Sequence, residues 1–161
     1  MHKDVTSPFS HLAHIGIVVK DLENVTKQLS ALGIGPFQPY HNELDVVPPV
    51  KRRLRGKPTE CELKIIGVKF GDVVLEFIQP AGDCIHSEFL ESGQEGLHHL
   101  GFFVDDLDKE VIKLAEKGLT PVMDGSMAKG NFFAYYQPKE TGSIIMELVQ
   151  NPATRPLKEQ K

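Results

Sequence analysis

The sequence HIGIVVKDLENVTKQLSALGIGP, residues 14–36, recurs at residues 99–121 as HLGFFVDDLDKEVIKLAEKGLTP. Eight of the 23 aligned positions are identical, with no gap and a constant offset of 85. Two later segments match at an offset of 71: VVLEFIQP at residues 73–80 and IIMELVQN at residues 144–151. Self-similarity at fixed offsets is the signature of a repeated structural unit. The chain therefore contains two copies of one module.

Each copy predicts the same order of elements. An apolar segment of strand length, 14–19 or 99–104, is followed by aspartates, Asp21 in the first copy and Asp105 and Asp106 in the second. Aspartate caps helix N-termini because its carboxylate accepts the unpaired first-turn N–H groups. An apolar helical pattern follows and stops at Gly33 or Gly118, where glycine suits the left-handed conformation of a helix end. About three strands then complete each copy.

The repeat predicts an α+β fold of two tandem βαβββ modules, related by a pseudo-two-fold axis, with a metal-lined cleft between them. We expect one domain over residues 10–150, with modules at about 10–80 and 95–150 joined by a short helical connector. Residues 151–161 are polar and contain proline, which predicts a flexible tail. The offsets of 85 and 71 differ by 14, so the first copy carries about that many extra residues, within 38–59.

The composition is that of an ordinary globular protein, with 40% hydrophobic and 25% charged residues in a chain of 161. The formal net charge of -4 gives no reason to expect a nucleic-acid partner. The sequence has no signal-peptide pattern and no apolar run of membrane-spanning length, which predicts a cytoplasmic protein without a membrane partner. Cys61 and Cys84 form neither a disulfide framework nor a CxxC metal motif.

The repeat places a histidine in the first strand and a glutamate in the last strand of each copy: His14, Glu76, His99 and Glu147. Alone, such a histidine is usually a hydrogen-bonded core residue, and such a glutamate usually faces solvent. Their recurrence in register favours a metal site instead, because a carboxylate among apolar neighbours is costly unless paired or metal-bound. The mixed nitrogen and oxygen donors suit Zn, Co, Ni, Mn or Fe(II).

His98 and the basic cluster at residues 51–55 are two further candidate features. His98 precedes His99, so strand alternation predicts that it points to the opposite face in a structural or supporting role. The basic cluster at residues 51–55 is usually a solvated loop. Its alternative is an anchor for a substrate phosphate or carboxylate, which makes Arg52, Arg53 and Arg55 candidate substrate-binding residues.

HIGIVVKDLE, GLHHLGFFVDDLD and SIIMELVQ resemble the ligand-bearing segments of the vicinal oxygen chelate superfamily, which includes glyoxalases, bleomycin-resistance proteins and dioxygenases. Residues 77–106 and the segment QPKETGSIIMEL most resemble methylmalonyl-CoA epimerases. The resemblance implies a glyoxalase-like fold, one divalent ion (Zn, Co, Ni or Mn) and the metal ligands His14, Glu76, His99 and Glu147. It also implies an acyl-CoA substrate and allows a homodimer.

For an epimerase, the resemblance implies two catalytic acid/base groups: Glu147 and, counted back from Gly71, Glu60. The segment 37–58 is longer and more basic than the epimerase connection, which bears on the substrate more than on the metal. One alternative is a glyoxalase-I-type lactoylglutathione lyase. A further alternative is an Fe(II) dioxygenase. That class uses two histidines and one carboxylate, so a second ligating glutamate argues against it. A non-catalytic binding or resistance protein of the same fold generally lacks the metal ligands.

Overall fold

A computed structural model describes residues 7–39, 51–126, 131–137 and 144–150. The predicted tail, 151–161, and residues 40–50, half of the stretch 38–59 that carries the extra residues of the first copy, lie outside the described residues. The first copy contains β1 (Leu12–Val18), α1 (Leu22–Ala31), β2 (Gln38–Pro39), β3 (Arg52–Leu54), β4 (Lys57–Pro58), β5 (Cys61–Phe70) and β6 (Val73–Gly82). Helix α2 (Ile85–Glu91) leads to the second copy, with β7 (Gly96–Phe103), α3 (Leu107–Glu116), β8 (Met123–Ser126), β9 (Phe132–Tyr136) and β10 (Ile145–Gln150).

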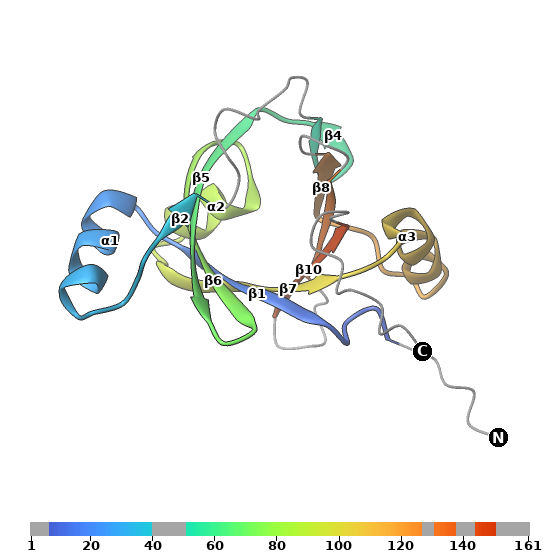
Figure 1. Ribbon diagram of the computed structural model, residues 1–161. Helices are drawn as coiled ribbons and strands as arrows, with labels where there is room; N and C mark the ends of the chain where they lie inside the picture. The colour runs from blue at the N-terminus through green and yellow to red at the C-terminus, as the bar shows by residue number, and fades with distance from the viewer. Residues whose placement is uncertain (1–6, 40–50, 127–130, 138–143, 151–161) are drawn as a thin grey trace, which may run out of the picture.

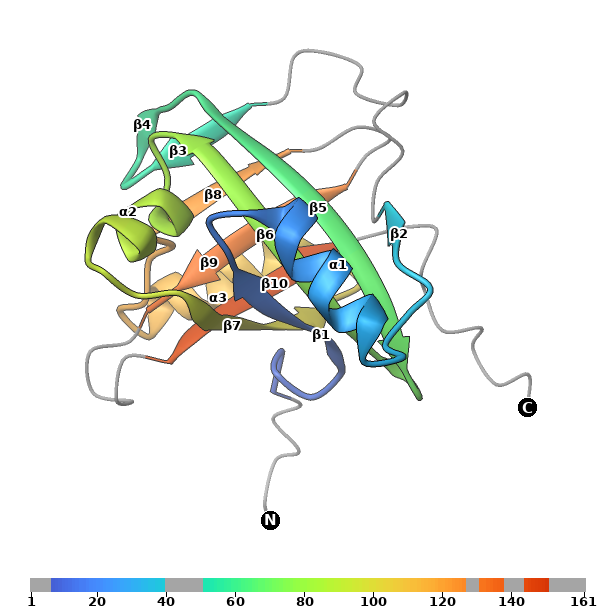
Figure 2. The same ribbon diagram turned by 90° about the vertical axis from the view of Figure 1, so that its left-hand side faces the viewer.

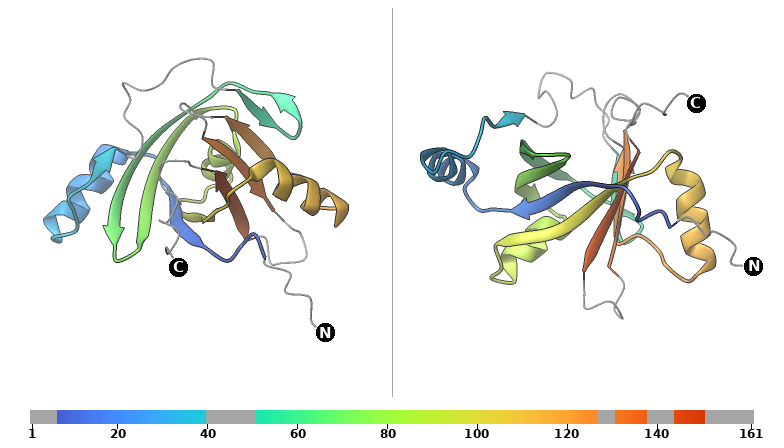
Figure 3. Two further views of the ribbon diagram at one scale, coloured as in Figure 1. Left: turned by 45° about the vertical axis from the view of Figure 1, so that its right-hand side comes forward. Right: turned by 60° about the horizontal axis from the view of Figure 1, so that its bottom comes forward.

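The strands form one curled sheet in the order β2-β5-β6-β1-β7-β10-β9-β8-β3-β4, with α1 and α3 outside it at opposite ends (Figure 1). Viewed from below, β1 and β7 run side by side through the centre (Figure 3). These two first strands pair antiparallel, and each pairs parallel with the last strand of its own copy, β6 or β10. The central four strands therefore have the pseudo-two-fold arrangement that the repeat predicts, and the glyoxalase-like α+β class is confirmed.

Both helices begin as the aspartates predict. The carboxylates of Asp21 and Asp106 accept from the backbone N–H groups of Asn24 and Lys109, at 2.9 and 3.1 Å. A second cap was not foreseen. The side-chain oxygens of Gln79 on β6 and Gln150 on β10, which match at the offset of 71, accept from Leu22 N at 2.8 Å and Leu107 N at 2.7 Å. Each last strand thereby holds the start of its own helix.

The hydrophobic core lies in three groups. Helix α1 packs on the group of Val19, Val68 and Phe77, and α3 buries Leu107 and Leu114 against Tyr136 and Leu148. The third group joins the copies, and its members are Cys61, Cys84, Ile85, Met123, Phe133 and Tyr135. Figure 2 shows α2 at one end of the curled sheet, close to β3 and β4. Within the described ranges, no helix has the length and apolar character needed to cross a membrane.

Strands β3 and β4 come from the long connection of the first copy but join the sheet edge of the second. β3 pairs antiparallel with β8, placing Arg52 opposite Gly125 and Leu54 opposite Met123. The extra residues therefore carry the first copy across to the second and close the sheet further, which was not predicted from the sequence.

Candidate metal centre

The four predicted ligands lie on adjacent strands in two rows of the sheet. In one row Glu76, Gly16 and His99 are neighbours across β6, β1 and β7. In the other row His14, Gly101 and Glu147 are neighbours across β1, β7 and β10. Each row therefore has a glycine between a histidine of one copy and a glutamate of the other.

These two glycines leave the space that the imidazoles occupy. A Cβ atom on Gly16 would overlap the ring of His99, and one on Gly101 would overlap the ring of His14. The His-x-Gly motif of each copy thus provides a ring for the centre and a gap for the ring of the other copy. The sequence shows both motifs, but only strand pairing explains why glycine follows each histidine at this spacing.

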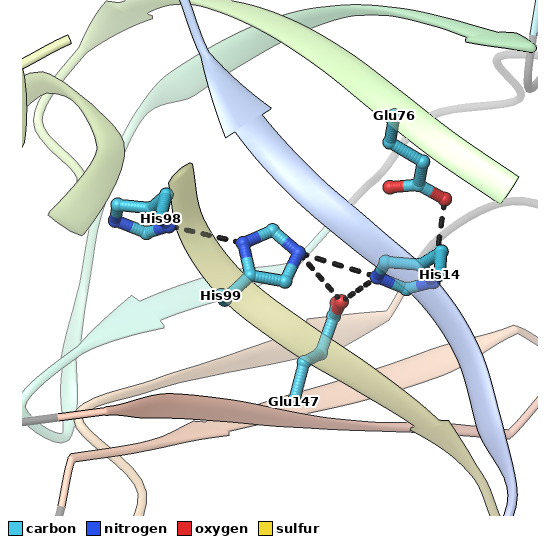
Figure 4. Close-up of polar contacts among 5 residues, drawn as sticks. All are labelled: His14, Glu76, His98, His99 and Glu147. Atoms are coloured by element: carbon cyan, nitrogen blue, oxygen red, sulfur yellow. Dashed lines mark hydrogen bonds and ion pairs between the residues drawn. The ribbon is translucent and has the colours of Figure 1, made fainter. Parts of the chain in front are cut away.

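Three of the four side chains converge. Nε2 of His14 lies 2.7 Å from Oε2 of Glu147 and 3.2 Å from Nε2 of His99, and the same Glu147 oxygen lies 3.2 Å from Nε2 of His99. Figure 4 shows the carboxylate of Glu147 facing both rings. All three residues are buried, with exposed fractions of 2–5%. The centre is therefore shared between the two copies, as the repeat predicts.

Glu76, the fourth predicted ligand, occupies a different position relative to His14. Its Oε1 atom lies 3.4 Å from Nδ1 of His14, on the ring edge that faces away from His99 and Glu147 (Figure 4). The structure thus groups His14, His99 and Glu147 as one set of potential metal donors and places Glu76 beside it.

The charges around the centre favour the protonated form of His14. Burial alone lowers the pKa of His14, but the carboxylates of Glu76 and Glu147 outweigh it and raise that pKa to about 9. Burial raises the pKa of Glu147, yet His14 and His99 lower it below its usual range. Burial lowers the pKa of His99 to about 4 despite the opposing effect of Glu147. The metal-free centre at neutral pH therefore has a protonated His14, an ionised Glu147 and a neutral His99.

The donor set fits a divalent ion. Zinc bonds of about 2.0–2.1 Å to nitrogen and oxygen in a tetrahedral arrangement separate the ligand atoms by roughly 3.3 Å. The three separations of 2.7–3.2 Å are slightly shorter and need only a small expansion around an ion. Two imidazoles and one carboxylate are also the donor types that such ions take.

His98 does not point away from His99, so the prediction from strand alternation is wrong. Nδ1 of His98 lies 3.0 Å from Nδ1 of His99, and both rings are buried. Burial, together with the neighbouring imidazoles of His86 and His99, lowers the pKa of His98 to about 2, so its ring is neutral. Strand alternation fails here because the pairing of β7 with β1 is irregular immediately before His99.

Tyr135 was missed by the sequence reasoning. It lies opposite Glu147 in the β9–β10 pair, and its ring packs edge-on against His99 with centroids 5.0 Å apart. Burial, followed by the carboxylates of Glu147 and Glu76, raises the pKa of Tyr135 well above its ordinary value. The phenol therefore stays protonated beside the centre. Its position is identified by its register opposite Glu147, and the sequence alone does not define that register.

The predicted catalytic residue Glu60 is not brought to this centre. Its side chain is exposed, and its backbone carbonyl accepts from Asp83 N–H at the end of the β5–β6 hairpin. In the β5–β6 pair, Gly67 lies opposite Glu76 and Cys61 lies opposite Gly82. The end of the hairpin next to Glu60 is therefore about six residues along β6 from Glu76.

The arginines predicted to bind substrate have partners within the chain. Arg53 donates from Nε to Asp124 at 2.7 Å, and Arg55 makes two contacts with Glu88 at 2.7 and 2.9 Å. A guanidinium N–H of Arg52 donates to the backbone carbonyl of Cys61. These contacts favour the interpretation that the arginines hold β3 against β8, α2 and β5.

Comparison with known proteins supports the fold. The family model described as the Glyoxalase/Bleomycin resistance protein/Dioxygenase superfamily matches residues 13–135. An uncharacterized protein of Bacillus subtilis (strain 168), YqjC, is 28% identical over 95 residues, covering 56% of this chain and 67% of YqjC.

Solved structures of similar fold include methylmalonyl-CoA epimerases. The enzyme from Mycobacterium tuberculosis is 21% identical, with a TM-score of 0.62 over 92% of this chain and 93% of its own. A Streptomyces coelicolor epimerase variant in complex with 2-nitronate-propionyl-CoA is 22% identical, with a TM-score of 0.65 over 92% and 99%. A hypothetical protein from Bacillus halodurans C-125 is 19% identical, with a TM-score of 0.63 over 93% and 96%. At these identities the likeness concerns the fold.

Proposed function

The chain belongs to the Glyoxalase/Bleomycin resistance protein/Dioxygenase superfamily, and from this we propose that it is a metal-dependent enzyme of α-proton transfer. The favoured reaction is epimerisation of a 2-substituted acyl-CoA of the methylmalonyl-CoA type. One observation carries the proposal: His14, His99 and Glu147, drawn from both copies, meet in a buried cluster with donor separations of 2.7–3.2 Å.

His14 and His99 would hold the ion through Nε2, and Glu147 through a carboxylate oxygen. Glu76 is still a prediction as the fourth ligand, because its Oε1 atom lies 3.4 Å from Nδ1 of His14 and its side chain would have to turn toward the centre. A divalent ion in this position polarises a bound carbonyl and stabilises negative charge that develops on its oxygen. That effect suits a reaction in which a C–H bond next to a carbonyl is broken.

Glu147 is the proposed proton acceptor. Its carboxylate is ionised at neutral pH because the two histidines lower its pKa. The α-proton would pass to Glu147 while the electron pair of the C–H bond forms the C=C bond of an enolate and the C=O π pair moves onto the carbonyl oxygen. Tyr135 keeps its proton and supplies a neutral hydrogen-bond donor near the same carboxylate.

Inversion also requires a proton donor on the opposite face of the carbon. The resemblance implies Glu60 for this role, and it remains a prediction, since its exposed position would have to change when substrate binds. The acyl-CoA class is supported by structural neighbours that hold methylmalonyl-CoA or 2-nitronate-propionyl-CoA. Arg52, Arg53 and Arg55 were the candidate phosphate anchor, but their contacts with Cys61, Asp124 and Glu88 favour a structural role, and kinetics must test the choice.

A glyoxalase-I-type lactoylglutathione lyase is the second candidate, because the same donors and the same kind of proton transfer serve a glutathione hemithioacetal. The two functions differ in substrate and in where the proton returns. An epimerase returns a proton to the same carbon from its opposite face, whereas the lyase delivers the proton to the neighbouring carbon.

The test uses purified protein loaded separately with Zn²⁺, Co²⁺, Ni²⁺ and Mn²⁺. Deuterium incorporation from D₂O is measured by NMR on methylmalonyl-CoA and on the methylglyoxal–glutathione adduct. Metal-dependent exchange at the α-carbon of methylmalonyl-CoA supports the epimerase. Conversion of the adduct to lactoylglutathione would replace it with the lyase, and exchange on neither substrate would reject both.

A further inference from the structure

The strand pair β1–β7 contains two register shifts, one in each copy, and each falls immediately before a histidine of the centre. On β1, Leu12 pairs with Phe102 and His14 with Gly101, so Ala13 is an extra residue. On β7, His99 pairs with Gly16 and Leu97 with Ile17, so His98 is an extra residue. A bulge of this kind changes the direction of a side chain and can bring consecutive residues into contact.

The two bulge positions are equivalent in the repeat, since 98 minus 13 is the offset of 85. The residue at this position is alanine in the first copy and histidine in the second. The second copy therefore has an imidazole beside its metal-facing histidine that the first copy lacks.

The His98 ring is held tightly. It stacks on His86 with centroids 4.8 Å apart and planes 28° apart, and Phe89 meets it edge-on at 5.0 Å. His86 is 0% exposed and His98 is 6% exposed. The 3.0 Å contact between the Nδ1 atoms of His98 and His99 thus lies in a buried aromatic group in which neither ring can turn freely.

This contact bears directly on the tautomer of His99. A neutral imidazole that offers the Nε2 lone pair to an ion has its proton on Nδ1. The buried Nδ1–H then needs an acceptor, and metal-bound histidines nearly always have one. For His14 the group facing Nδ1 is Glu76, at 3.4 Å. For His99 it is Nδ1 of His98.

We propose that His98 is a positioning residue of the metal centre: its Nδ1 accepts the Nδ1–H of His99 and so directs the Nε2 lone pair of His99 toward His14 and Glu147. The inference rests on the proposed metal site. It assigns different supports to the two copies, a carboxylate for His14 and an imidazole for His99, and this imidazole stands where the first copy has Ala13.

A rival arrangement is a second metal bound by His86, His98 and His99, whose ring nitrogens also lie close together. The stacking of His86 and His98 opposes it. Imidazole lone pairs lie in the ring plane, and two stacked rings whose planes are inclined by only 28°, with centroids 4.8 Å apart, are poorly placed to direct lone pairs to one ion. The proposal therefore requires one ion per chain.

The experiment compares His98→Phe, which keeps an aromatic ring against His86 but has no acceptor, with His98→Asn, which restores a side-chain oxygen near the Nδ1 position. The dissociation constants of Zn²⁺ and Co²⁺ are measured by competition with a chromogenic chelator, together with the melting temperature of each metal-free protein. We expect His98→Phe to weaken metal binding by about 10- to 100-fold, as loss of a supporting partner typically does. His98→Asn should stay within about threefold of the wild type.

Long-range ¹H–¹⁵N NMR of the wild-type protein reads the tautomer of His99 directly, without any variant that could fail to fold. A proton on Nδ1 supports the proposal, and a proton on Nε2 of the metal-free neutral ring overturns it. Equal affinity of wild type and His98→Phe, equal weakness of the two variants, or two ions per chain would each overturn it as well. If the wild type takes up no divalent ion, the proposed metal function fails, and the tautomer of His99 still decides the contact with His98.

Discussion

The imidazole of His14 occupies the space that a side chain on Gly101 would fill, and His99 stands in the same relation to Gly16. Each histidine thus reaches the centre across a glycine of the other copy. This reciprocal arrangement depends on the pairing of β1 with β7, which sets the two His-x-Gly motifs against each other.

Replacing Gly101 with alanine should displace the His14 ring and weaken divalent-metal binding at least tenfold. The ring lies at the end of a side chain and can turn away, so the fold should survive, with a loss of about 1–3 kcal/mol as for other overpacked sites. Metal titration and thermal melting measure the two effects. Gly118→Ala is the control, because a Cβ there meets nothing within 4 Å, and alanine is disfavoured there only by the φ of 81°. A Gly101→Ala protein with wild-type metal affinity would contradict this role.

Metal binding should release a proton at neutral pH. The pKa of His14, lowered by burial but raised more by Glu76 and Glu147, is about 9 in the metal-free protein, and a metal ligand must be deprotonated. Affinity should therefore rise about tenfold per pH unit up to about pH 9 and then level off. Calorimetry at pH 7.5 in buffers of different ionisation enthalpy counts the proton. No release at that pH would mean that His14 is neutral before the ion binds.

The metal-free protein should lose stability as pH rises from 6.5 to about 9. The folded pKa of His14 lies above its ordinary value of 6.5, so the folded state binds the extra proton in this window. That contribution is fully present below pH 6.5 and is lost through pH 9, by about 3 kcal/mol for this shift. Urea unfolding at several pH values measures it. The decline should be smaller in Glu76→Gln, which removes one of the charges that raise this pKa.

Glu147→Gln should abolish α-proton exchange more completely than it weakens metal binding. The amide can still offer an oxygen to an ion but cannot accept a proton, so exchange should fall at least 100-fold, as for loss of a general base. Metal content by emission spectroscopy and exchange in D₂O are measured on the same sample. Glu76→Gln is the matched variant from the other copy and should retain more exchange. Wild-type turnover by Glu147→Gln would place the base elsewhere.

Arg53→Ala and Arg55→Ala should change KM for an acyl-CoA by less than about threefold. Both side chains are more than half exposed and already paired, with Asp124 and Glu88. Exposed pairs of this kind contribute about 0–1 kcal/mol each, so the melting temperature should fall only slightly. Steady-state kinetics decide the matter. A rise in KM of tenfold or more with kcat unchanged would restore these arginines as a phosphate anchor.

The sequence by itself determined the duplication, the order of strands and helices, the aspartate caps and the recurrence of one histidine and one glutamate per copy. The element order and the caps are local features, because helical and strand periodicity, capping and turn residues depend on nearby positions. The duplication is visible because two distant segments of the sequence match each other. The repeat then paired His14 with His99 and Glu76 with Glu147 as equivalent positions, and the structure brings His14, His99 and Glu147 together.

Only the tertiary structure decided which ring nitrogen meets which carboxylate, and that His98 contacts His99. It also decided that β3 joins the sheet edge of the second copy, that its arginines are paired, and that Glu60 is exposed. These outcomes depend on bulges, ring rotation and contacts between distant strands. A one-residue shift of register redirects a side chain without altering the local pattern that predicts the strand, so no periodicity in the sequence could reveal them.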